Sequence, residues 1–186
     1  MAKKLLATRT ASSSASLEFL TGINTTYPEY EFQFFNIHPA TQDDHWQVQF
    51  NAYDPSAGTP QLTGFNETIT STYIRAYNND ADNDGAFGYN TTYDHEQEVT
   101  YQTLLHVVDD DTADNCVGRL TLFNPSNAVY AKHFMSEVQG NHHSSGYSMV
   151  AYVGGYINTT LAITQVSFKF SSGNIEAGTI KMYGVG

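Results

Sequence analysis

The sequence is short of cysteine and of charge. Cys116 is the only cysteine among 186 residues, which rules out a disulfide within the chain and leaves the redox compartment open. Charged residues make up 15% of the chain, against about 25% in ordinary soluble domains. A chain with so little Lys, Arg and Glu lacks the usual material of solvated helix faces. Its length fits one domain that folds without a disulfide or a metal.

Long apolar runs are missing as well. Leu5, Leu6 and Ala7 are far shorter than the apolar segment of about 7–15 residues in a secretory signal. No window approaches the run of about 18 apolar residues that marks a membrane-spanning helix. We therefore expect no export signal in residues 1–16 and no membrane as a partner.

The charge that is present is unevenly distributed. The net charge is −11, yet Lys3, Lys4 and Arg9 all precede the first acid, Glu18. The other five cations stand against all 19 acidic residues, so residues 10–186 carry a net charge of −14. Such an acidic body repels nucleic acid, which we do not expect as a partner.

The basic N-terminal segment has two interpretations. It is either a frayed, solvated end, as chain termini usually are, or an arm in which Lys3, Lys4 and Arg9 dock onto a more acidic neighbour. We assign residues 1–14 to this arm and residues 15–186 to a single domain.

What the sequence has in quantity is material for strands and turns. It contains 13 Tyr and 11 Phe against a single Trp, and aromatic residues favour pleated, half-buried surfaces. Apolar residues recur with period two, as at Trp46, Val48 and Phe50, which alternate with glutamines. This alternation predicts strands with one side in a core and the other in water. The stretches 32–37 and 149–153 are apolar on both sides, which indicates central strands or faces buried against a second subunit.

Turn clusters divide these runs into about ten short strands, which predicts an all-β fold, an antiparallel sandwich or barrel. Residues 70–77 are the one plausible helix, and we favour a strand there. We place strands near residues 15–20, 30–37, 45–53, 68–77, 97–107, 117–123, 129–138, 147–156, 162–170 and 178–185.

Two acidic loops, residues 78–96 and 109–115, are longer than a hairpin needs, and loops of this kind usually carry recognition. The first contains Asp80, Asp82 and Asp84 before Gly85, the opening of a calcium-binding loop. Position twelve is Thr91 instead of Glu, so an EF-hand is excluded.

Two interpretations of this motif stay open. One is a looser calcium site that Asp94 or Glu96 completes. The other is an Asn/Asp-rich turn with side-chain-to-backbone hydrogen bonds. We interpret residues 109–111 with Asp114 as a solvated loop, and no other cofactor is expected.

Motifs for catalysis or a zinc site are lacking. The pair His142-His143, with His133 nine residues earlier, suits a polar loop better than a metal site. The Asp-rich loop beside Cys116 opposes thiolate formation. No Gly-x-Ser-x-Gly elbow, His-Glu-x-x-His helix or phosphate-binding Gly-rich loop occurs. We therefore expect no enzyme.

Several tyrosines are candidates for contact with a ligand or partner. We expect these aromatic side chains to be exposed, where they could stack on sugars or lie in a protein interface, a place where Tyr is enriched. They are Tyr27, Tyr30, Tyr89 and Tyr93.

The chain ends in ITQVSFKFSSGNI at residues 163–175 and GTIKMYGV at residues 178–185. Upstream it contains YEFQF at 30–34, IHPAT at 37–41, LFNPS at 122–126 and the stretch 11–19. In these segments the chain resembles a family of virion structural proteins of tailed bacteriophages of the marine type. In this ending we expect Gly173-Asn174 to turn a hairpin and the last strand to direct Ile180 and Met182 inward.

The resemblance implies a β-sandwich of jelly-roll type that works as an oligomer in the virion, assembled in the host cytoplasm. We expect a non-catalytic capsid decoration or cement protein. The expected partners are copies of itself in a homotrimer and the major capsid protein or tail proteins. One alternative is a tail or fibre component that binds host-surface glycans. Another is a calcium-dependent carbohydrate-binding module.

Overall fold

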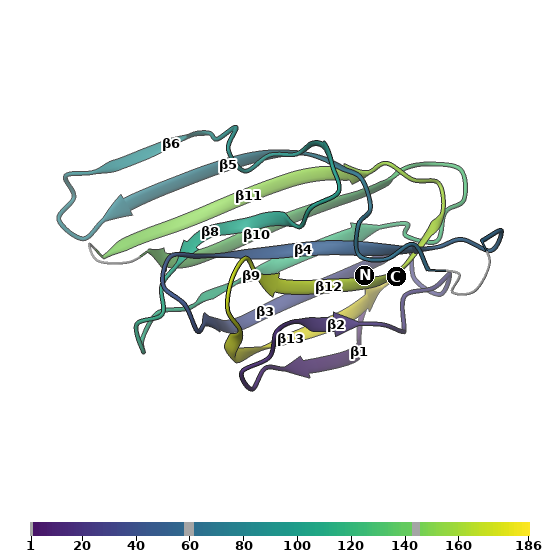
Figure 1. The fold of residues 1–186 in the computed structure, drawn as a ribbon, viewed down its shortest axis with the longest axis horizontal. Helices are drawn as coiled ribbons and strands as arrows, with labels where there is room; N and C mark the ends of the chain where they lie inside the picture. Colours follow the sequence, from purple (N-terminus) through teal and green to yellow (C-terminus); the bar gives the residue numbers. More distant parts are fainter. Residues whose placement is uncertain (1, 58–61, 143–145) are drawn as a thin grey trace.

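Antiparallel strands in two sheets make up the described part of the chain (Figure 1). The computed structural model describes residues 2–57, 62–142 and 146–186. Within these ranges it contains 13 strands and no helix, so the prediction of an all-β antiparallel sandwich is confirmed. No helix long and apolar enough to cross a membrane occurs in the described residues.

The larger sheet has nine strands and the smaller has four, and every pairing between neighbours is antiparallel. The larger sheet contains, in spatial order, β1 (Lys3–Thr10), β13 (Ile175–Val185), β3 (Glu29–Pro39), β9 (Cys116–Phe123), β10 (Lys132–His142), β11 (Tyr147–Ile157), β5 (Ile69–Asn79) and β6 (Gly85–Tyr89), with β7 (Glu96–Glu98) also paired to β5. The smaller sheet contains, in order, β2 (Leu17–Phe19), β12 (Ala162–Phe170), β4 (Asp44–Tyr53) and β8 (Gln102–Val108).

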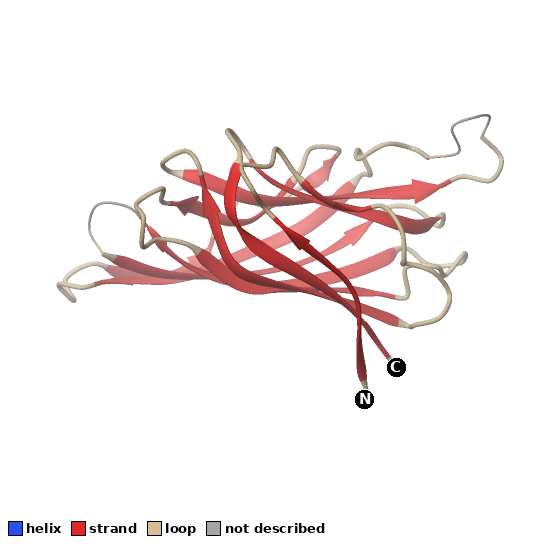
Figure 2. Cartoon of the chain, turned by 90° about the horizontal axis from the view of Figure 1, so that it is seen from below, coloured by secondary structure: helices blue, strands red, loops and turns tan. Residues whose placement is uncertain are grey.

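The chain passes repeatedly from one sheet to the other. Strands β2, β4, β8 and β12 belong to the smaller sheet, and the strands between them in the sequence belong to the larger one. Eight of the twelve connections between described strands therefore bridge the two layers, which Figure 2 shows one above the other, and the other four stay within the larger sheet. This alternation ties the sheets together covalently at both ends of the sandwich.

Aromatic side chains fill the space between the sheets. Trp46 of β4 stacks on Phe168 of β12 at 5.8 Å between ring centroids, and Phe34 of β3 meets Phe168 edge-on at 5.2 Å. Phe19 and Phe32 extend this cluster toward β2. All five side chains are buried. Offset and edge-on ring contacts of this kind add to the stabilisation from burial alone.

All ten predicted strands form, and residues 70–77 lie within β5. The sequence analysis missed β1 and β6, and its predicted strand at residues 97–107 merges β7 with β8. Strand β6 is exposed along most of its length, and β7 has only three residues. Such strands carry little apolar alternation, the signal on which the prediction depends.

The basic N-terminal segment lies in the sheet instead of standing apart as an arm. Residues 3–10 form the edge strand β1, which pairs with β13. Lys3 Nζ donates to Glu31 Oε2 at 2.6 Å, and the Arg9 guanidinium lies 5.5 Å from the Phe19 ring centroid. These internal contacts engage two of the three cations that we predicted to dock onto a neighbour.

The expected hairpin at Gly173-Asn174 is wrong. Strand β12 lies in the smaller sheet and β13 in the larger, so this turn carries the chain between sheets. Gly173 has a positive φ of 63°, a conformation that favours glycine. The expected direction of Ile180 and Met182 is confirmed, since both are buried.

Candidate interaction sites

The three aspartates of the calcium-like motif, Asp80, Asp82 and Asp84, lie in the exposed turn between β5 and β6, and the carboxylates of the last two accept hydrogen bonds from separate partners. Tyr147 Oη donates to Asp84 Oδ2 at 2.6 Å, and Asn78 Nδ2 donates to Asp82 Oδ1 at 3.3 Å. Asn79 Oδ1 accepts the backbone N–H groups of the residues at 83 and 84. This is the side-chain-to-backbone pattern of an Asx-rich turn. Asp80, Asp82 and Asp84 are not among the described groups whose ligand oxygens converge.

A different acidic group does converge. Carboxylate oxygens of Asp109, Asp111 and Asp114 lie within 4.8 Å of one another, and Asp109 is completely buried. The prediction of a solvated loop is therefore wrong for Asp109. Burial, followed by the charges of Asp109 and Asp111, raises the pKa of Asp114. Asn141 Nδ2 donates to Asp114 Oδ1 at 2.6 Å, which satisfies part of the cluster from within the protein.

Cys116 is inert because of burial. The side chain is fully buried at the start of β9, and burial raises the pKa of its thiol. The sequence analysis expected the same direction from the neighbouring aspartates, but burial is the cause.

The histidine candidates do not form a described metal group. His133 lies on β10, with its ring 6.2 Å from that of Tyr156, while His142 ends the same strand. His143 lies outside the described residues. No group of three potential ligands containing a histidine occurs in the described part of the chain.

The tyrosine candidates divide into buried and accessible ones. Tyr30 is completely buried, against our expectation, and its hydroxyl bonds to the backbone of Asn24. Tyr27 packs edge-on against it at 6.0 Å. Tyr89 is exposed on β6, and Tyr93 is half-buried in the segment that follows.

The outer face of the larger sheet, here called the open face, carries unusually large exposed apolar side chains. Met135 is 61% exposed and Phe87 is 77% exposed. A sandwich strand normally turns polar residues to this side. The exposed apolar residues come from five of the six consecutive strands between β3 and β6 in the sheet and are Phe35, Val117, Met135, Tyr152, Phe87 and Tyr89.

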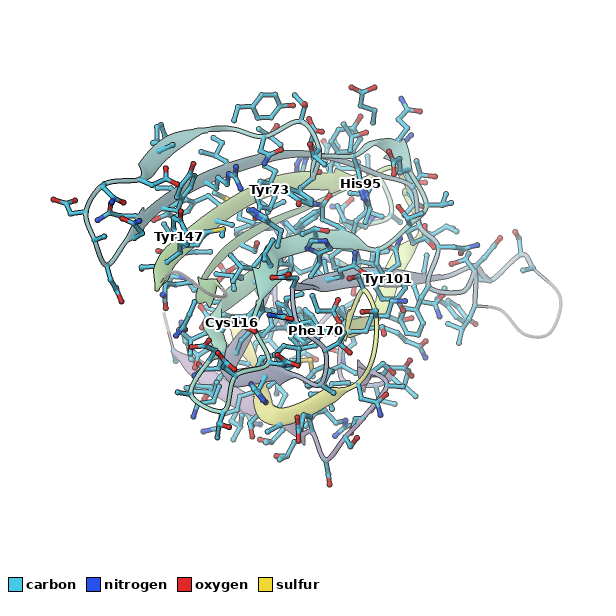
Figure 3. All side chains as sticks on the ribbon, turned by 60° about the vertical axis from the view of Figure 1, so that its left-hand side comes forward. Tyr73, His95, Tyr101, Cys116, Tyr147 and Phe170 are labelled. Atoms are coloured by element: carbon cyan, nitrogen blue, oxygen red, sulfur yellow. The ribbon has the colours of Figure 1, made fainter. Side chains whose placement is uncertain are left out.

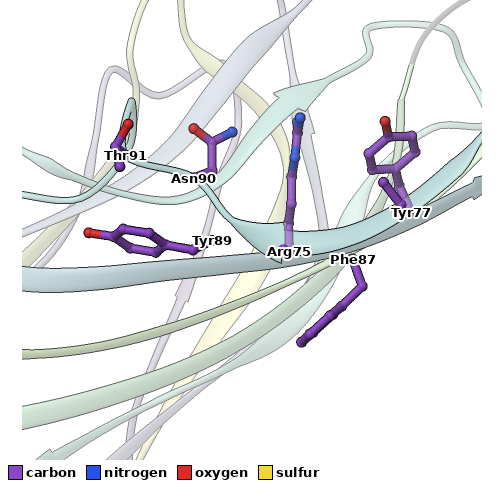
Figure 4. Close-up of a pocket in the computed structure, with 8 residues that line it drawn as sticks. Arg75, Tyr77, Phe87, Tyr89, Asn90 and Thr91 are labelled. Carbon is purple, nitrogen blue, oxygen red and sulfur yellow. The ribbon is translucent and has the colours of Figure 1, made fainter.

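Strand register places these residues on one side of the sheet. Ala76 of β5 pairs with Phe87, whose ring points away from Arg75 and Tyr77 in Figure 4. Arg75 and Tyr77 share the inner side with the buried Tyr73. Phe87 therefore extends the open face to the edge of the sheet.

Two apolar hollows lie on the open face. One, of about 290 Å³, is lined by Phe35, Val117 and Val150 around Gly118. The other, of about 400 Å³, is lined by residues around Met135 and Gly154. Gly154 has open space where a side chain would stand, so the absence of a Cβ there deepens the hollow.

Charge on the open face is balanced internally. Strands β9, β10 and β11 contribute one cation and one anion to it, Arg119 and Glu137, whose Nη2 and Oε2 atoms are 3.1 Å apart. Toward β1, Lys3 pairs with Glu31; burial would raise the pKa of that carboxyl, but hydrogen bonds from Lys3 and Gln33 lower it on balance. Lys181 Nζ lies 5.0 Å from the Phe35 ring centroid.

The outer face of the smaller sheet is built in the opposite way, with buried polar side chains. Gln49, Asn51 and Ser167 occupy positions that alternation predicts to be in water, yet all three are buried. The prediction is wrong there because loop segments cover the sheet. Asn51 Oδ1, for example, accepts bonds from Thr63 Oγ1 and the Gly64 N–H.

One of these covering segments, residues 90–101, is held by hydrogen bonds from buried side chains to its backbone. Gln49 Nε2 donates to the carbonyl oxygens of Val99 at 3.1 Å and Thr100 at 2.9 Å. Gln102 Nε2 donates to the Tyr93 carbonyl at 2.8 Å. Ser71 exchanges bonds with the backbone of residue 95. Buried, satisfied polar networks fix local geometry, so this segment is rigidly placed.

A groove of about 440 Å³, here called the 90–101 groove, lies between this segment and the smaller sheet. Its floor comes from Gln47, Thr103 and Lys169, which belong to three neighbouring strands. Its wall is formed by Thr92, Tyr93, Asp94, His95, Glu98, Thr100 and Tyr101, with Ser171 at one end. Figure 3 labels His95 and Tyr101 of this wall.

Behind the groove lies a cluster of histidine and tyrosine rings. Tyr93 stacks on His106 at 4.4 Å, and His106 Nδ1 lies 2.8 Å from Tyr73 Oη. Arg75 donates to His106 Nε2, so that nitrogen accepts and Nδ1 carries the proton. Burial lowers the pKa of His45, whose ring lies 5.4 Å from that of Tyr93.

Comparisons of the chain with protein-family models, curated proteins and solved structures give no match. The open face, the 90–101 groove and the sequence motifs are therefore the observations that point to a function.

Proposed function

We propose that this protein is a non-catalytic structural protein of a tailed-phage virion, a capsid decoration or cement protein that assembles as a homotrimer. The open face carries this proposal. The resemblance of residues 163–185 to phage virion proteins is the reason for proposing a virion. The alternation of the chain between sheets supports a jelly-roll topology. Its partners would be copies of itself and the major capsid protein or tail proteins.

Exposed apolar area is the first support for assembly. Large contiguous apolar patches are uncommon on monomeric proteins and mark interaction surfaces. Tyr and Met are also enriched at the centres of interfaces, and the open face presents Tyr152 and Met135 there.

Charge balance favours a second copy of this chain as the occupant. The molecule carries −11 overall, so two copies repel in most orientations. On the open face, however, Arg119 already has Glu137 as a partner and Lys3 has Glu31. These four charges are already paired when two such faces approach, which reduces the penalty of burying charge in the interface. They can also exchange partners, Arg119 of one copy with Glu137 of the other.

Sedimentation of a variant with two new negative charges on the open face tests the assembly. We expect the unaltered protein to sediment as an oligomer and the double variant Met135→Glu with Tyr152→Glu to sediment as a monomer. Both side chains point to solvent within one chain, so the free energy of unfolding should change by less than about 0.5 kcal/mol per site.

The matched control is Val129→Glu with Tyr130→Glu, since both of these exposed side chains lie in a loop outside the open face. A monomeric unaltered protein, or equal dissociation by both double variants, would contradict the proposal.

Electron microscopy of labelled particles tests the position in the virion. We expect an antibody against this chain to label the head, and labelling at the tail would replace the capsid proposal with a tail component. For the basic segment, Lys4→Glu is a better probe than deletion of residues 1–14, because deletion removes β1 and exposes the edge of β13. Undiminished particle binding by Lys4→Glu would count against docking through this strand.

A further inference from the structure

The 90–101 groove differs from the two hollows of the open face in the chemistry of its lining. Hydroxyl, amide, carboxyl and ammonium groups surround it, contributed by residues such as Thr92, Gln47, Asp94 and Lys169. Aliphatic side chains are absent from its lining. An apolar peptide side chain or a lipid tail would therefore find little to bury there.

The charges of the groove also narrow the choice of ligand. Asp94 and Glu98 bring two carboxylates, against the single ammonium of Lys169. A polyanion such as nucleic acid or a sulfated glycan would meet net repulsion. A neutral ligand with many hydroxyl groups can bond both to the carboxylates and to the ammonium and amide donors.

Tyr101 supplies an aromatic surface at a fixed position. Its hydroxyl donates to Ser167 Oγ at 3.1 Å, and Lys169 Nζ lies 4.5 Å from its ring centroid. The backbone just before it is held by Gln49. Such preorganisation lowers the entropic penalty of binding, because the wall is already ordered without ligand.

We propose that the 90–101 groove binds a neutral saccharide, with Tyr101 against the C–H face of a sugar ring and Gln47, Asp94, Glu98 and Lys169 bonding to its hydroxyls. The volume of about 440 Å³ falls in the range of small-molecule sites. This function goes beyond assembly and does not depend on it. In a virion it would let the protein hold a host-surface glycan, as a tail or fibre component would.

The test uses the full chain and four neutral probes: tetramers of glucose, mannose, galactose and N-acetylglucosamine, titrated by calorimetry and by saturation-transfer NMR. We expect at least one to bind at millimolar or lower concentration. Tyr101→Ala should weaken that binding about tenfold or more, since it removes the aromatic contact. Thr92→Arg, a change at an exposed position, should weaken it by obstructing the groove, whether or not Tyr101→Ala folds.

Tyr130→Ala is the matched control, an exposed tyrosine far from the groove in sequence, and should leave binding unchanged. Three results would overturn the proposal: no binding of any neutral probe, binding that both groove variants retain, or tighter binding of a sulfated tetramer. The open-face variant Met135→Glu with Tyr152→Glu should keep the saccharide site, so failure of assembly and failure of this site are distinguishable.

Discussion

The outer faces of the two sheets reverse the usual distribution of polar and apolar residues, and they do so in opposite directions. The larger sheet exposes Phe87 and Met135, while the smaller sheet buries Gln49 and Asn51. Within the described residues nothing covers the exposed apolar side chains of the first face, whereas loops cover the second. An uncovered apolar face is typical of a surface that binds another molecule. The buried polar side chains of the smaller sheet instead bond to loops of the same chain, and these bonds position the 90–101 groove.

Among these tests, removal of the buried Gln49 side chain should lower the free energy of unfolding most. Gln49→Ala leaves three carbonyl oxygens, of Glu67, Val99 and Thr100, without their donor. We expect the free energy of unfolding to fall by about 2–4 kcal/mol, because unsatisfied buried groups are expensive. Denaturant unfolding measures this, and hydrogen exchange should report faster opening of residues 98–101.

The matched substitution on the open side is Gln139→Ala, an exposed glutamine of β10. Its effect should stay below about 1 kcal/mol. Equal losses for the two variants would show that the 90–101 segment does not depend on its buried anchors.

Two adjacent glycines of β11 face opposite sides of the larger sheet: a side chain at Gly155 would point into the core, and one at Gly154 would point to the open face. A Cβ at Gly155 would lie 2.7 Å from the Phe134 ring and 2.9 Å from the Thr70 carbonyl oxygen, whereas one at Gly154 would meet nothing within 4 Å. We expect Gly155→Ala to destabilise the fold by about 1–3 kcal/mol through overpacking. Gly154→Val should be neutral or stabilising by about 0.5 kcal/mol, because valine suits a strand.

Thermal and denaturant unfolding of both variants checks this pair. Gly154→Val also fills a hollow of the open face. We therefore expect weaker association of the copies, while the free energy of unfolding of the chain stays unchanged or rises slightly. Destabilisation by Gly154→Val equal to that by Gly155→Ala would place residue 154 in the core.

A fall in pH should change the free energy of unfolding least among these tests, and it should act through histidines near the 90–101 groove. Burial lowers the pKa of His45 and of His95 below the ordinary value of 6.5. The unfolded chain therefore binds more protons than the folded chain as the pH falls below about 6.5, and stability declines there. Between about pH 7.5 and 5.5 we expect the free energy of unfolding to decrease, and His95→Gln should flatten this slope. A slope that is unchanged in His95→Gln would contradict the assignment.

Much of the fold was predictable from the sequence. Alternation at Trp46, Val48 and Phe50 located β4, and the same period located nine other strands. The missed strands β1 and β6 and the short β7 pack little apolar area, so no clear periodic signal marks them. The sites were less predictable. Convergence of Asp109 with Asp114 depends on the folding of a loop, and the placing of Tyr101 beside Lys169 depends on the packing of segments 68 residues apart in the sequence.

The sequence by itself determined the class of the protein: period-two alternation and turn residues allow strands, and a shortage of charge leaves little material for helices. It also determined the absence of a disulfide, since Cys116 stands alone. Only the tertiary structure decided which face of each strand meets water. Alternation assigns two sides to a strand but does not say whether a loop covers the polar side or leaves the apolar side bare. That decision depends on contacts between distant segments, such as Gln49 with Thr100, and it produced both the open face and the 90–101 groove.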